Sequence, residues 1–166
     1  DANGDGEPSF STMIADAHPT LSFFLETVGS SGRSDSLFIM GRSLGSHSAV
    51  ELAFHHREHL RGLIVESGAP NVARLARRFG LVSEQLAALE QAASARIQSI
   101  DLPALIIHGE RDSLIPVAEA IAFHEEIGSN EKRLVVIPGA DHNNIMLVGA
   151  EQYFSEVRDF VSRNSG

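Results

Sequence analysis

Four short apolar runs, separated by helical patterns, constrain the fold of this chain more than any other feature. They are SLFIM (36–40), GLIVES (62–67), ALIIH (104–108) and KRLVVI (132–137). Each run has the length and the apolar character of a strand that is buried on both faces. Strands that alternate with helices form parallel sheets that helices cover on both sides. The sequence therefore predicts an α/β fold with a mostly parallel sheet of about four strands, in a single domain spanning 1–166.

The segments around these runs have the residue spacing of helices. Helices are expected over 11–28, 44–57 and 117–127, and a closing helix is marked by Tyr153, Phe154, Val157, Phe160 and Val161. Pro19 interrupts the first helix, so we expect a kink or a restart there. In the second helix Gly45, Ala49 and Ala53 recur every four residues. They leave a smooth face that can lie close to a sheet.

Composition argues against several classes of function. The net charge of −9 disfavours non-specific nucleic-acid binding, which needs basic residues to neutralise phosphates. The chain has no run near the roughly 18 apolar residues of a membrane span, and its acidic start, DANGDGEPS, is unlike a signal peptide. We therefore expect a cytoplasmic protein. Without cysteine, neither a disulfide nor a thiolate metal site can form. The sequence implies no metal and no organic cofactor.

The stretch FIMGRSLGSHSAV, residues 38–50, places a serine between two glycines where a strand gives way to a helix. Gly41 and Gly45 are expected to leave room where side chains would collide with a sharp turn, and Ser43 would present its hydroxyl there. The backbone N–H of Leu44, at the helix start, would face an oxyanion formed at Ser43. G-x-S-x-G also occurs by chance in loops rich in glycine and serine. Its position between a buried strand and a small-faced helix favours a nucleophile elbow.

A serine hydroxyl needs a general base to become a good nucleophile, and the chain has eight histidines. His142 follows the last predicted strand, in a turn that Pro138 and Gly139 open. It therefore belongs at the carboxyl edge of the sheet, where ligands gather in such folds, and we expect it to be the base. His108 is expected to pack beneath the site. Solvated or packing positions, or no evident role, are expected for the others: His18, His47, His55, His56, His59 and His124.

A third side chain must orient the imidazole and stabilise its charged form. Asp112 follows the third predicted strand, in HGERDSLIP, at the same edge of the sheet. The alternatives are Glu66, at the end of the second strand, and Asp141, beside the histidine. We expect Asp141 to point away from the neighbouring ring and Glu66 to be a wall or structural residue. The favoured order Ser43, Asp112, His142 matches the Ser…Asp…His order of one fold class.

Residues 70–99 predict two further amphipathic helices, with Ser83 as the N-cap of the second. Four arginines in this segment could attract anionic substrates, but a solvated helix face is the favoured interpretation. They are Arg74, Arg77, Arg78 and Arg96.

The pieces FIMGRSLGSHSA, GLIVESGA, LPALIIHGERDSLIP and VVIPGADHNNI together resemble the α/β-hydrolase superfamily, specifically its small bacterial esterase-like serine hydrolases. They extend in family order over nearly the whole chain, and their combination is far more specific than the pentapeptide alone. The resemblance implies Ser43 as nucleophile, Asp112 as acid and His142 as base. It also implies that 70–99 is a short helical cap that covers the site and shapes an acyl pocket.

The resemblance departs from the superfamily at the start of the chain. Family members have further strands before the segment that DANGDGEPSFSTMIADAH resembles, and a loop among them supplies a second oxyanion N–H. The chain resembles the C-terminal two-thirds of a hydrolase, so we expect a fragment, a cleavage product or a natural truncation. Loss of one oxyanion donor typically lowers turnover about a hundred- to a thousandfold. An open edge is expected at strand 36–40, and with it a homodimer or a rearranged N-terminal segment over that edge.

The function predicted from the sequence is hydrolysis of carboxylic esters, small or short-acyl, through an acyl-enzyme on Ser43. A thioesterase or peptidase with the same three residues is one alternative. A catalytically impaired scaffold or binding module is the other, and the missing oxyanion loop favours it. The expected partner is a small-molecule ester, with no nucleic acid and no membrane.

Overall fold

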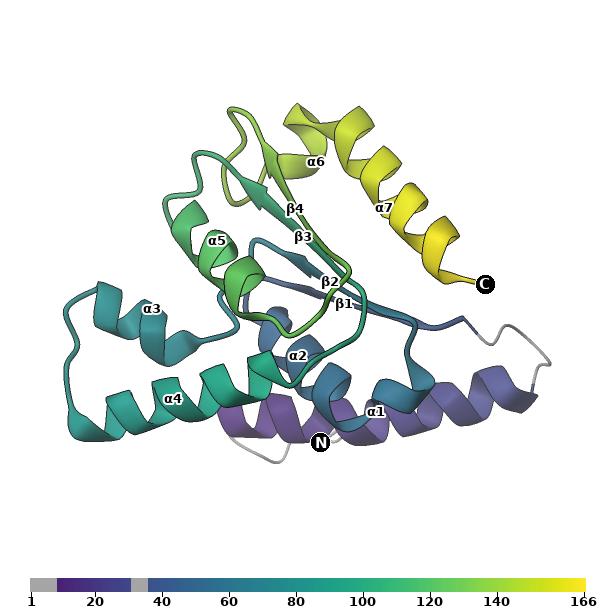
Figure 1. The fold of residues 1–166 in the computed structure, drawn as a ribbon, viewed down its shortest axis with the longest axis horizontal. Helices are drawn as coiled ribbons and strands as arrows, with labels where there is room; N and C mark the ends of the chain where they lie inside the picture. Colours follow the sequence, from purple (N-terminus) through teal and green to yellow (C-terminus); the bar gives the residue numbers. More distant parts are fainter. Residues whose placement is uncertain (1–8, 31–35) are drawn as a thin grey trace.

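The computed structural model describes residues 9–30 and 36–166. Its four strands form one sheet in the order β1-β2-β3-β4, and every neighbouring pair is parallel (Figure 1). The strands are β1 (Phe38–Arg42), β2 (Gly62–Glu66), β3 (Ala104–Gly109) and β4 (Lys132–Ile137). The predicted α/β fold with a parallel sheet of about four strands is confirmed.

Helices cover both faces of this sheet. They are α1 (Phe10–Ser30), α2 (Gly45–His55), the 3₁₀ helix η1 (Arg57–His59), α3 (Val72–Arg78), α4 (Glu84–Gln98), α5 (Val117–Glu126), α6 (Ile145–Val148) and α7 (Ala150–Asn164). Helices α2 and α5 pack on one face, and α7 lies on the opposite side of the sheet (Figure 1). Helix α1 continues through Pro19, so of the two expected outcomes the restart is wrong and the kink stays a prediction. Among the described helices, none is both long and apolar enough to cross a membrane.

The apolar runs are continuous because the two inner strands are buried on both faces. In β2, Leu63 and Val65 point into the core beneath α2 and α5, whereas Ile64 points into the core beneath α7. In β3, Ile106 and Ile107 divide between the two cores in the same way. Successive side chains of a strand alternate between faces, so a strand with helices on both sides needs an apolar residue at every position.

Strand β1 lies at one end of the sheet, and β2 is its only partner among the described strands. An apolar groove of about 590 Å³ runs between this strand and helices α1 and α2. Its lining includes Leu21 and Phe24 of α1, Ile39 of β1 and Leu52 of α2. The open edge expected from the sequence is therefore present in the described part of the chain. Association of two copies through it stays a prediction.

Segment 70–99 folds as the two predicted helices, α3 and α4. Ser83 caps α4, because its hydroxyl oxygen accepts a hydrogen bond of 3.0 Å from the N–H of Leu86. Asn71 caps α3 in the same way, through a bond of 3.1 Å from the N–H of Arg74. The assignment of this helix pair as a cap over the site stays a prediction.

The arginines of this segment make ion pairs, and the expectation of a solvated helix face is wrong for Arg74. The Arg74 side chain is only 14% exposed and contacts Glu119 at 3.2 Å and Glu126 at 2.8 Å. Arg78 donates to the other oxygen of Glu119 at 2.7 Å, and the carboxylate of Glu119 is fully buried at the start of α5. These bonds attach α3 to α5. They also supply the charged partners that the buried carboxylate of Glu119 needs in order to remain charged.

The other two arginines of the segment also pair with carboxylates. Arg77 is 58% exposed and bonds Glu90 on α4 at 2.8 Å, so for this residue the solvated face is correct. Arg96 reaches across to the mostly buried Glu51 of α2. The ion pairs therefore link α4 to α3 and to α2.

Replacement of the buried acid should destabilise the fold far more than replacement of the exposed one. Glu119→Gln takes the charged partner from Arg78 and leaves Arg74 with Glu126, and we expect a loss of about 3 kcal/mol in the free energy of unfolding. Glu90→Gln removes one exposed pair and should cost less than about 1 kcal/mol. Urea denaturation of the two variants measures the difference. Equal losses would show that burial of Glu119 does not set the strength of this contact.

Strand β1 and helix α2 approach each other closely at Gly41. A β-carbon built on this residue would lie 2.5 Å from the carbonyl oxygen of Gly45 and 2.7 Å from the β-carbon of Ala49. A β-carbon on Gly45 would have no heavy atom of the described residues within 4 Å, apart from its own chain neighbours and helix backbone. The expectation that both glycines prevent a collision is therefore correct for Gly41 and wrong for Gly45. Helix α2 meets Gly41 through the backbone carbonyl of Gly45, whereas the position of a β-carbon on Gly45 is open.

The two glycines provide a matched pair of substitutions. Gly41→Ala forces β1 and α2 apart, and we expect it to cost about 3 kcal/mol or more. Gly45→Ala fits without overlap and also favours the helix, so stability should stay the same or rise slightly. Thermal unfolding of both variants measures the difference. A stable Gly41→Ala variant would contradict the close approach.

Candidate active site

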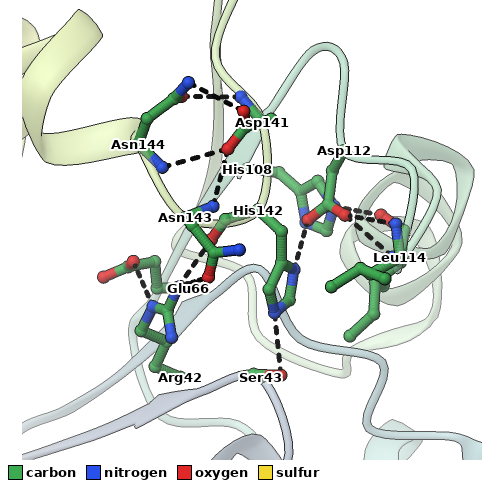
Figure 2. Close-up of polar contacts among 11 residues, drawn as sticks. Arg42, Ser43, Glu66, His108, Asp112, Leu114, Asp141, His142, Asn143 and Asn144 are labelled. Atoms are coloured by element: carbon green, nitrogen blue, oxygen red, sulfur yellow. Dashed lines mark hydrogen bonds and ion pairs between the residues drawn. The ribbon is translucent and has the colours of Figure 1, made fainter.

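The carboxyl ends of the parallel strands bring four loops to one edge of the sheet. Ser43 follows β1, Asp112 follows β3, and His142 follows β4. Figure 2 shows the imidazole of His142 between the hydroxyl of Ser43 and the carboxylate of Asp112. The structure thus brings together the three side chains that the sequence singled out, although 69 and 30 residues separate them along the chain.

Two hydrogen bonds join these side chains in a row. His142 Nδ1 lies 2.7 Å from Asp112 Oδ2, and His142 Nε2 lies 3.0 Å from Ser43 Oγ. A carboxylate only accepts, so Nδ1–H donates to Asp112, and the lone pair of Nε2 then faces the hydroxyl of Ser43. Asp112 and His142 are 6% and 8% exposed, so little water competes for these bonds. The arrangement can transfer a proton from Ser43 Oγ to Nε2 while the carboxylate stabilises the resulting charge.

Ser43 sits in a strained turn between β1 and α2. Its φ of 51° lies in the left-handed region, which a residue with a side chain rarely occupies. Its N–H donates to the carbonyl oxygen of Glu66 on β2 at 2.9 Å, so hydrogen bonding to β2 extends one residue beyond the strand. The hydrogen bond to β2 and the close contact at Gly41 stabilise this turn. The hydroxyl of Ser43 therefore faces His142.

Helix α2 begins directly after the serine. Leu44 is its N-cap residue, and no side chain among the described residues caps this helix end. The first N–H groups of a helix have no partner within the helix and carry a partial positive charge. The Leu44 N–H is therefore suited to the oxyanion role that the sequence predicted, which stays a prediction.

Asp112 is held by its own loop. Its second oxygen, Oδ1, accepts from the N–H of Leu114 at 3.0 Å and of Ile115 at 2.8 Å. Oδ2 is thereby left to face His142. His108 lies fully buried beneath this carboxylate, as expected, with its Nε2 2.8 Å from the carbonyl oxygen of Ile115. Burial lowers the pKa of His108, which therefore stays neutral beside the acid.

The alternative acids have other partners. Asp141 accepts from the N–H groups of Asn143 and Asn144 at 2.8 and 3.1 Å, so it closes the turn that carries His142. Glu66 is 2% exposed and binds Arg42 and Tyr153. Both residues thus take the structural positions that the sequence analysis favoured for them.

Two of the remaining histidines contact each other. His18 of α1 and His56, directly after α2, are joined by a hydrogen bond of 2.8 Å. His47 packs edge-on against Phe10, and burial lowers its pKa to about 4. Within the described ranges, no group of three or more histidine or acidic side chains is placed to hold a metal ion.

Sequence analysis missed Arg42, the residue before the serine. Its guanidinium reaches the carbonyl oxygen of His142 at 2.6 Å and the carboxylate of Glu66 at 3.1 Å. The only signal in the sequence is an arginine two residues after the first predicted strand and a glutamate near the end of the second. That signal becomes meaningful once the strands are known to pair with these two residues side by side.

Comparison with known proteins gives a partial family match. Residues 76–146 match the model of a hydrolase family described as serine aminopeptidase, S33. This range contains Asp112 and His142 but not Ser43. An uncharacterized membrane protein of Saccharomyces cerevisiae is 26% identical over 96% of this chain and 56% of its own length. Protein bem46 of Schizosaccharomyces pombe is 23% identical over 96% of this chain and 54% of its own length. The chain thus spans a little over half the length of these curated relatives.

Solved structures share the fold. An esterase of Pyrococcus furiosus superposes with a TM-score of 0.70 at 21% identity, over 92% of this chain and 62% of that one. At 21% identity, this superposition shows that the two chains share a fold. The resemblance stated from the sequence is confirmed at the level of the fold, because the chain has the fold of the α/β-hydrolase superfamily. The closer likeness to small bacterial esterase-like serine hydrolases stays a prediction.

Proposed function

We propose that this chain cleaves carboxylic esters through an acyl-enzyme on Ser43. The observation that carries the proposal is the row of hydrogen bonds from Asp112 through His142 to Ser43, buried at the carboxyl edge of the sheet. A chance cluster would not also place the serine in a left-handed turn before an uncapped helix. Each of these features is what nucleophilic acyl transfer requires of its site.

The reaction follows from the positions of the atoms. Ser43 Oγ attacks the ester carbonyl carbon as its proton moves to His142 Nε2. The tetrahedral oxyanion then faces the N–H of Leu44 at the start of α2. His142 returns the proton to the departing alkoxide, and the C–O bond to the alcohol breaks. Water then attacks the acyl carbon as His142 Nε2 takes its proton. The acyl C–O bond to Ser43 breaks, and Nε2 returns the proton to Ser43 Oγ as the acid leaves. Asp112 holds the imidazole in the required tautomer throughout.

Esters suit this site better than amides. An alkoxide or phenoxide leaves a tetrahedral intermediate more readily than an amine, so ester cleavage demands less stabilisation of the oxyanion. The site offers the Leu44 N–H for that purpose, and removal of one such donor typically costs about a hundred- to a thousandfold in turnover. Esters with good leaving groups are therefore the proposed substrates, with the small or short acyl group that was expected from the sequence. The esterase of Pyrococcus furiosus is consistent with this chemistry on the same fold.

Peptide hydrolysis is the second candidate, because the family whose model matches residues 76–146 is described as a serine aminopeptidase. The same nucleophile, base and acid would act. An esterase should release p-nitrophenol from p-nitrophenyl acetate, whereas an aminopeptidase should release p-nitroaniline from aminoacyl p-nitroanilides. Faster turnover of the anilides would favour the peptidase.

Labelling by a fluorophosphonate probe tests the nucleophile. The intact chain should label, and Ser43→Ala should abolish the label because no other hydroxyl faces His142 Nε2 among the contacts of the described residues. His142→Gln and Asp112→Asn should slow labelling by about a thousandfold or more, since the proton acceptor is lost or held in the wrong tautomer. Ser22→Ala, on the exposed surface of α1, is the control and should label like the unsubstituted chain.

Folded protein that does not label would contradict the proposal. Labelling without turnover of any ester, thioester or anilide would instead favour a catalytically impaired scaffold. Circular dichroism of each variant separates a lost nucleophile from a lost fold.

A further inference from the structure

The guanidinium of Arg42 connects the serine turn to the histidine loop. Arg42 is joined by the peptide bond to Ser43, and its Nη2 donates to the carbonyl oxygen of His142 at 2.6 Å (Figure 2). The same nitrogen lies 3.3 Å from Oδ1 of Asn143. We propose that Arg42 is a positioning residue that fixes the imidazole of His142 relative to the hydroxyl of Ser43. The proposal rests on the proposed serine hydrolase function.

Glu66 anchors the guanidinium from the neighbouring strand. Arg42 and Glu66 are paired in register at the ends of β1 and β2, and Nε donates to Glu66 Oε1 at 3.1 Å. The other oxygen of Glu66 accepts from the hydroxyl of Tyr153 on α7 at 2.8 Å. The backbone oxygen of Glu66 accepts from the N–H of Ser43. One buried glutamate therefore holds the serine by its backbone and the arginine by its side chain.

The histidine loop is attached to the loop of Asp112, through the N–H groups of Arg111 and Gly139, and Arg42 attaches it to the serine turn. Asp141 and Asn144 bind each other through both backbone and side chains, and these bonds shape the turn itself. Asp112 holds only the far side of the imidazole, at Nδ1. Arg42 reaches the backbone of His142 from the elbow, so it controls the separation of Nε2 from Oγ. A displacement of about 1 Å at such a site can cost about a hundredfold in rate.

A planar guanidinium suits this position better than an ammonium. It donates from Nε to one acceptor and from Nη2 to another in a fixed geometry, and Glu66 and His142 use these two nitrogens. A lysine at the same place would present one charged nitrogen, which could reach one acceptor well but not both. Arg42→Lys therefore keeps the positive charge but loses the simultaneous contact with both acceptors, so it tests the positioning of His142 separately from the charge.

The test compares steady-state hydrolysis of p-nitrophenyl acetate by the full chain with Arg42→Met and Arg42→Lys. We expect kcat to fall about ten- to a hundredfold in Arg42→Met, with KM within about twofold, because the side chain positions the base and does not bind substrate. Arg42→Lys should lie between Arg42→Met and the unsubstituted chain. Arg158→Met removes an equal charge from the exposed surface of α7, and it should retain full activity.

Each other outcome overturns the proposal. Full kcat in a folded Arg42→Met or Arg42→Lys variant would show that the contact does not position His142. A raised KM with unchanged kcat would make Arg42 a substrate-binding residue. If neither variant folds, as judged by thermal melting, the role is structural only. Absence of both labelling and hydrolysis in the unsubstituted chain would remove the proposed function, and the positioning role with it. Labelling at Ser43 with an unaltered Arg42→Met rate would remove the positioning role alone.

Discussion

Parallel pairing of the four strands is the constraint on which the site depends. Every strand runs in the same direction, so the loops after β1, β2, β3 and β4 leave the sheet at one edge. The pairing also continues past the strand ends, where Ser43 N–H donates to Glu66 and Ser67 N–H donates to Ile107, each at 2.9 Å. Ser43 and Ser67 both have a positive φ, of 51° and 45°. The last bonds of the sheet thus hold the turns that a free chain would avoid.

The acid and base loops are joined through their backbones, which explains how a short chain keeps the imidazole and carboxylate in contact. The N–H of Arg111 donates to the carbonyl oxygen of Ala140 at 2.8 Å, and the carboxylate of Glu110 accepts from the N–H of Gly139 at 2.8 Å. A β-carbon on Gly109 would lie 2.6 Å from that same Ala140 oxygen. The two loops therefore form one unit, and the serine turn is the part that must be aligned with it. Arg42 spans this junction.

The parts of the fold that the sequence predicted are those that depend on local patterns. Continuous apolar runs identified all four strands, and Ser83 marked the start of α4. The boundaries of elements differ from the prediction where tertiary contacts extend an element. The first strand was expected to end before Gly41, but β1 continues through Arg42, because both residues pair with β2. Arg74 was expected on a solvated face, yet it is buried against α5. Its acceptors, Glu119 and Glu126, lie more than 40 residues away, where no local pattern reveals them.

By itself, the sequence determined the order of strands and helices and the residues that stand at the carboxyl end of each strand, because periodicity and strand direction are enough to place them. It also singled out Ser43, Asp112 and His142, since each lies at a strand end in a turn of recognisable composition. Only the tertiary structure decided which oxygen of Asp112 meets the imidazole, which glycine of the elbow has no room for a side chain, and which residue attaches the histidine loop to the serine. Those outcomes depend on small differences in the distances between atoms of residues that packing brings together, and local sequence patterns do not reveal such differences.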